Sequence, residues 1–121
     1  MALPRRFLIA SAASLTALVA LAGPAAAHAE ANATAEAAGR TGVTVSLTHG
    51  CDGNPTTGLR VSLPAGATAI KGVDSDGWTS TVSASEISWT GGSLPATKTG
   101  AFAFNLVLSQ PAGSIVVLPT I

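Results

Sequence analysis

Few residues of this 121-residue chain carry groups suited to chemistry. The chain has two histidines and one cysteine, and His49 and Cys51 lie two residues apart, with Asp52 beside the thiol. A structural metal site usually needs four ligands, and cysteine catalysis needs a base that a third group holds in place. One thiol and one neighbouring imidazole meet neither requirement. No Ser-His-Asp arrangement or suggestively spaced carboxylate pair is evident either, so we do not expect an enzyme.

His28 is the strongest candidate ligand because of its position in the chain. Residues 1–27 are typical of a signal peptide, with two arginines, an Ala-rich apolar stretch and a small-residue cleavage region in that order. Cleavage after Ala27 would leave His28 as the N-terminus, with an α-amine and an imidazole that together suit Cu(II). Cleavage after Ala29 would remove this histidine, and a solvated residue without a ligand role is the alternative interpretation.

The apolar stretch within residues 1–27 could also be interpreted as a membrane span. Its short length and the Ala-Xaa-Ala pattern that follows it favour cleavage, which predicts secretion or residence in the cell envelope. No later segment could anchor the chain in a membrane. Residues 28–121 hold four basic and six acidic residues, a net charge of −2 without a basic stripe, so nucleic acid is not an expected partner.

Short alternating runs occupy most of the chain after residue 42, and turn-forming residues, including the pair Gly91-Gly92, separate them. This pattern predicts an antiparallel immunoglobulin-like β-sandwich, all-β, preceded by an N-terminal signal helix. Phe102 and Phe104 should be buried, and Trp78 and Trp89 should pack in or against the core. The predicted strands are 43–47, 59–63, 68–73, 78–82, 86–90, 101–108 and 114–118.

Residues 28–42 lack aromatic side chains and an apolar period. We expect a flexible N-terminal arm there, or an irregular edge strand, with the sandwich domain spanning residues 43–121. The chain stops at Ile121, close to a β run, which predicts a domain that is incomplete at its C-terminus or ends at an unprotected edge.

Four segments carry a resemblance to a known family: HGCDGNPTT from His49, RVSLPAGATAIK from Arg60, GW from Gly77, and SWTGGSLP from Ser88. They resemble the YcnI-like family of exported bacterial copper-binding domains, over roughly residues 43–121. The resemblance implies that His28 acts as an N-terminal histidine brace for Cu(II), in copper acquisition or handling. It also implies a copper ion, and a copper-transport membrane protein, as partners.

The same resemblance implies that Cys51 is half of a disulfide whose second cysteine would lie past Ile121. A buried thiol and an intermolecular bridge are the alternatives for this cysteine.

This chain departs from the family pattern at two ligand positions. The segment from Leu94 to Phe104, where the family places a carboxylate ligand, contains no Asp or Glu, and the family's C-terminal tryptophan would lie beyond Ile121. Glu30 and Glu86 are the remaining candidate carboxylates, although strand alternation would turn Glu86 away from Trp89. The alternative function is therefore a structural or interaction β-sandwich that has lost its copper site. An oxidative copper enzyme is disfavoured because no second histidine ligand is evident.

Overall fold

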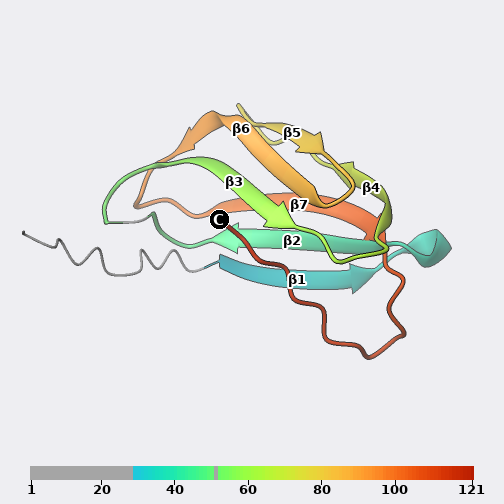
Figure 1. Ribbon diagram of the computed structural model, residues 1–121. Helices are drawn as coiled ribbons and strands as arrows, with labels where there is room; N and C mark the ends of the chain where they lie inside the picture. Colours follow the sequence, from blue (N-terminus) through green and yellow to red (C-terminus); the bar gives the residue numbers. More distant parts are fainter. Residues whose placement is uncertain (1–28, 51) are drawn as a thin grey trace, which may run out of the picture.

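The computed structural model describes residues 29–50 and 52–121, which form two antiparallel sheets packed face to face (Figure 1). A four-stranded sheet has the order β1-β2-β7-β4, and a three-stranded sheet has the order β3-β6-β5. The predicted all-β sandwich is confirmed. The predicted signal helix lies outside the described residues. The strands are β1 Ala29–Ala35, β2 Thr41–Leu47, β3 Thr56–Ser62, β4 Thr68–Gly72, β5 Thr79–Val82, β6 Glu86–Leu94 and β7 Gly100–Val107.

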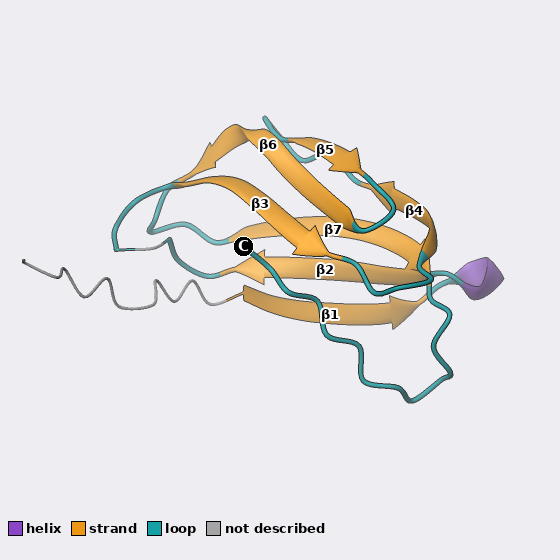
Figure 2. Ribbon diagram, viewed as in Figure 1, coloured by secondary structure: helices purple, strands orange, loops and turns teal. Residues whose placement is uncertain are grey.

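Within the described residues the only helix is a 3-10 turn at Ala37–Gly39, shown at the far end of β1 in Figure 2. None of the helical structure in residues 29–50 and 52–121 is long and apolar enough to cross a membrane.

Strand alternation builds the core between the two sheets. On β2 and β7 the register places Val43 opposite Phe104 and Val45 opposite Phe102, and all four side chains are buried. Trp89 of β6 is fully enclosed, with ring centroids 5.5 Å from Phe102 and 6.1 Å from Phe104. The burial predicted for the two phenylalanines and the packing role predicted for the tryptophans are confirmed. The buried core comprises Val43, Val45, Leu47, Leu59, Val61, Leu63, Trp78, Ile87, Trp89, Phe102, Phe104 and Leu106.

The segment expected to be a flexible arm is largely a regular strand. Residues of β1 pair with β2 without interruption, from Ala29 opposite Leu47 to Ala35 opposite Thr41. Backbone hydrogen bonds hold this strand although all seven of its residues are exposed. Ala29–Ala35 is therefore part of the four-stranded sheet, as an edge strand with a regular rather than an irregular register.

The glycine pair expected to be a turn lies inside a strand. β6 continues through Gly91 and Gly92 to Leu94, which pairs with Thr56 of β3. The register shifts at this point, and Gly91 has φ +91, a backbone conformation that glycine adopts readily. The pair is thus a bulge in β6 rather than the end of a strand.

The strand predicted at residues 114–118 does not form. Of the C-terminal segment, only residues 119–121 pair with β3. The N–H of Ser62 donates to the carbonyl of Pro119, and Arg60 and Ile121 exchange two backbone hydrogen bonds. Continuing this antiparallel register would place Leu118 opposite Leu63, past the end of β3, and earlier residues opposite the turn at Pro64. Residues 114–117 therefore lie beyond the part of β3 with which the C-terminus pairs.

Candidate metal site

The candidate ligand His28 lies outside the described residues, immediately before β1. Ala29 pairs with Leu47 and Leu47 pairs with Gly100, so the start of β1, the end of β2 and the start of β7 share one end of the sandwich. At this end a hydrogen bond joins the β2–β3 turn to the β6–β7 turn, because the Gly50 N–H donates to the carbonyl of Ala96 at 3.1 Å. This end of the domain is therefore the surface that a ligand at residue 28 would adjoin.

Three polar candidates lie at the same end, one on β1 and two in the β2–β3 turn. Glu30 is exposed on β1 and pairs with Ser46, while His49 and Asp52 are exposed in the β2–β3 turn. The His49 Nδ1 lies 3.1 Å from the carbonyl oxygen of Gly50. Nowhere in residues 29–50 and 52–121 do three or more His, Cys, Asp or Glu residues gather to hold a metal ion. Cys51 lies outside the described residues.

The structure separates Glu86 from this end. Glu86 is the first residue of β6 and pairs with Ser62, the last residue of β3. The other end of β6 pairs with the first residue of β3. The whole length of a nine-residue strand therefore lies between Glu86 and the end where β1 begins. Glu86 is also on the face of β6 opposite the buried Trp89, as strand alternation predicts. Of the two carboxylates considered, only Glu30 is near the start of β1.

The segment from Leu94 to Phe104 offers no substitute ligand. It forms the β6–β7 turn and the first part of β7, where Phe102 and Phe104 face the core and Ala101 points to the other side. The turn itself carries Lys98, whose charge would oppose a cation. The residues described at this end therefore supply scattered single donors, and a nitrogen pair at residue 28 would have to provide most of the affinity.

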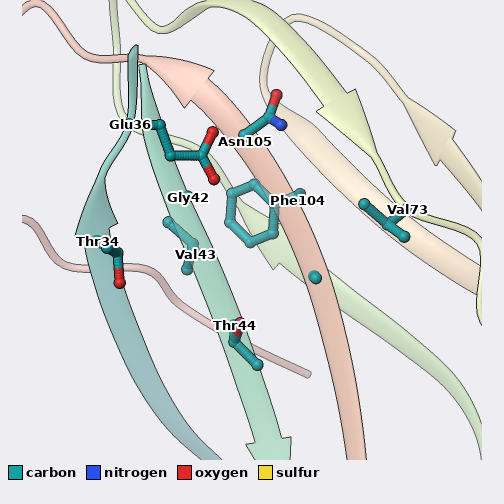
Figure 3. Close-up of a pocket in the computed structure, with 9 residues that line it drawn as sticks. Thr34, Glu36, Gly42, Val43, Thr44, Val73, Phe104 and Asn105 are labelled. Carbon is teal, nitrogen blue, oxygen red and sulfur yellow. The ribbon is translucent and has the colours of Figure 1, made fainter. Parts of the chain in front are cut away.

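A second polar region lies on the outer face of the four-stranded sheet (Figure 3). Here the Glu36 carboxylate lies over Gly42, so closely that a Cβ on this glycine would overlap with it. Arg40 donates a guanidinium N–H to the Asn105 side-chain oxygen. The hollow of about 150 Å³ thus combines one carboxylate with a nearby cation, an arrangement that does not suit a metal ion.

One carboxyl group, that of Asp74, lies in the β4–β5 turn and accepts two hydrogen bonds from Ser80. The Ser80 hydroxyl donates to Asp74 Oδ1 at 2.7 Å and the Ser80 N–H donates to it at 2.8 Å. These two bonds lower the pKa of Asp74 from its usual 3.8, the hydroxyl bond contributing most. Because the carboxylate links the β4–β5 turn to β5, we assign it a structural role.

A comparison with known families finds similarity to one family model over about half of the chain. Residues 28–87 match a family model described as a domain of unknown function, DUF1775, which is the YcnI-like family domain. The match extends from the residue before β1 to the second residue of β6. No curated protein matches the chain.

Proposed function

We propose that this chain is an exported copper-binding protein in which His28, as the N-terminal residue of the processed chain, binds Cu(II). The supporting observation is a coincidence at residue 28. The family match begins there, the expected cleavage position lies directly before it, and the paired strand β1 begins directly after it. Processing at this position would remove residues 1–27 and make His28 the N-terminal residue, directly before Ala29 of β1.

The chemistry of the proposed site follows from a terminal histidine. Its α-amine and imidazole provide two nitrogen donors, which favour Cu(II) over the other divalent first-row ions. Both nitrogens must be deprotonated to bind, so affinity should fall as the pH is lowered. The following residue, Ala29, is paired with Leu47, so the terminal amine would be attached to ordered backbone rather than to a long arm.

The expected affinity is modest because few further ligands are at hand. Glu30 is the only carboxylate on β1 and the nearest in sequence to His28. Two nitrogens, one exposed carboxylate and water would make an exchangeable site. Such a site suits acquisition or handling of copper, with transfer to a copper-transport membrane protein, better than it suits oxidative catalysis.

The test compares two forms of the protein that differ by one residue. Chains starting at His28 and at Ala27 are titrated with Cu(II) and followed by electron paramagnetic resonance. The extra residue converts the terminal amine into an amide and should abolish most of the binding, whereas His49→Ala in the chain starting at His28 should change little. Glu30→Gln should weaken binding if this carboxylate is a third ligand.

Equal binding by both forms would overturn the proposal of an N-terminal copper site. Absence of binding by the processed form would do so too, and an interaction module without metal would then be the better interpretation. Zn(II) serves as the competing ion, and a preference for Zn(II) over Cu(II) would also contradict the proposed nitrogen ligation.

A further inference from the structure

Among residues 29–50 and 52–121, β1 pairs with β2 alone, which leaves its other edge with a regular set of hydrogen-bonding groups. It is the outermost strand of the four-stranded sheet, with β2 on one side (Figure 1). The N–H of Glu36 donates to the carbonyl of Arg40 at 2.8 Å, in line with the β1–β2 register. Hydrogen-bonded pairs recur at every second residue of an antiparallel ladder, so the even-numbered residues of β1 bond to β2. The N–H and C=O groups of the four alanines, at 29, 31, 33 and 35, therefore point to the open edge.

Apart from the charge of Glu30, this edge lacks the features that usually block pairing between sheets. β1 contains no proline, no lysine or arginine, and no break in its seven-residue register with β2. Exposed edges are normally protected by such residues or by bulges. The small side chains of β1 would also allow another strand to approach closely.

We propose that β1 pairs antiparallel with β1 of a second copy of this chain, about a two-fold axis at Asn32. This register places Ala31 opposite the partner's Ala33 and Ala29 opposite the partner's Ala35, so all four alanines of each copy form backbone hydrogen bonds. Moving the axis to Ala31 would leave Ala35 unpaired. The proposed interface is isologous and joins the two four-stranded sheets into one continuous sheet.

The side chains that this register brings together are compatible. Glu30 lies opposite the partner's Thr34, a hydroxyl donor, and Asn32 lies opposite the partner's Asn32, where amides can bond to each other. No like charges oppose each other, because Glu30 is the only charged residue of β1. A second copy is thus a suitable occupant by both backbone and side-chain criteria.

The C-terminal segment adds apolar surface on the same side of the domain. Val116 and Leu118 line a hollow of about 130 Å³ together with Ala31 and Ala33 of β1. Ile115, next to Val116, is 94% exposed and Val117 is 73% exposed. Large apolar side chains gathered on one segment are typical of a contact surface, and a sheet docked at the β1 edge would approach them.

The register can be tested by disulfide trapping. In a chain from His28 carrying Cys51→Ser, Asn32→Cys should form a cross-linked dimer under mild oxidation. In the proposed register residue 32 lies opposite residue 32 of the second copy, as a non-hydrogen-bonded pair. The Cα atoms of such a pair are about 4.5 Å apart, within the range that a disulfide can bridge. Thr34→Cys is the matched control on the same face, and its opposite residue would be the partner's Glu30. Cross-linking of both variants to the same extent, or of neither, would overturn the proposed register.

Light scattering after size exclusion tests the dimer without cross-linking. The unmodified chain should have twice the mass of one chain, and Ala31→Pro should restore the single-chain mass. Proline at this position removes a donor that faces the open edge, whereas Asn32→Pro removes a bond to β2 and should lower the melting temperature. Substituting Ile115 and Val117 by serine should weaken the dimer. A single-chain mass for the unmodified protein at all concentrations would overturn the proposal, whatever its metal content.

Discussion

Gly92→Ala tests the placement of the glycine pair within β6. A Cβ at this position would lie less than 3.0 Å from three atoms of the Trp78 indole ring, a separation that real Cβ atoms essentially never show. The indole is buried and packs edge-on against Phe102, with ring centroids 5.1 Å apart. The ring therefore has little room to move away from a new methyl group.

The expected cost is that of overpacking, about 1–3 kcal/mol of unfolding free energy. Replacing glycine also restricts the unfolded chain, which offsets about 0.4–1 kcal/mol of this cost. Gly58→Ala is the matched control in the neighbouring strand. Its Cβ would have its nearest neighbour 3.9 Å away, at the carbonyl of Trp89, so this substitution should be neutral or slightly stabilising.

Urea unfolding followed by tryptophan fluorescence measures both variants. The two tryptophans are buried, so their emission should change as the core opens. Introducing Trp78→Phe should reduce the cost of Gly92→Ala, because a smaller ring relieves the overlap, and a double-mutant cycle isolates this coupling. If Gly92→Ala matches Gly58→Ala in stability, the indole does not lie over Gly92 and the reasoning is refuted.

Three further predictions concern the core, a turn and processing. Phe104→Ala should cost about 3–5 kcal/mol because the ring is buried. Val82→Ala at a partly exposed site should change stability by less than about 0.5 kcal/mol in the same denaturation assay. Asp74 has a lowered pKa in the folded state, so its bonds to Ser80 should stabilise the fold above pH 3.8 and lose this effect as the pH falls through the lowered pKa. The difference in melting temperature between the native chain and Asp74→Asn should therefore shrink in acid, and a constant difference would contradict this account. The secreted protein should start at His28 by intact mass, and a start two residues later would exclude the N-terminal copper site.

Strict alternation of large apolar residues predicted the core strands well. The run from Phe102 to Leu106 alternates between core and outer face as the spacing of two requires, and so does the run from Val43 to Leu47. In both strands, one face must be buried against the opposite sheet, so the sequence carries the constraint directly.

The turn predicted at the glycine pair and the strand predicted at residues 114–118 are wrong for a different reason. Both interpretations used local residue type, but the outcome depended on partners distant in sequence. Gly91 and Gly92 stay in β6 because Thr56 continues the ladder on β3 and Trp78 needs the space above Gly92. Residues 115–117 are apolar, but the antiparallel register of the C-terminus would place them opposite residues that follow Ser62, the last residue of β3. Strand edges and their lengths, which decide such cases, are not visible in a local pattern.

The candidate metal site could be predicted only as a single residue. His28 was identified from its position after a cleavage pattern, and it lies outside the described residues. The structure contributes the surroundings: Glu30 is the second residue of the strand that follows, and Glu86 lies at the opposite end of the sandwich. Which carboxylate is near the N-terminus is a matter of topology, so spacing in the sequence could not have distinguished the two.

β1 shows most clearly which signal the sequence did contain. Its sequence alternates alanine with Glu30, Asn32 and Thr34, and the alanines at 31 and 33 pair with the buried Val45 and Val43. The period of two was present, but alanine is a weak marker because it buries little area and is common in helices. β1 is held to β2 by backbone hydrogen bonds. Its small side chains leave a hollow on its inner face, which Val116 and Leu118 also line. Because β1 pairs only with β2 among the described residues, its outer backbone groups have no partner strand there. The composition that obscured this strand is thus the same composition that would let a second copy pair with it.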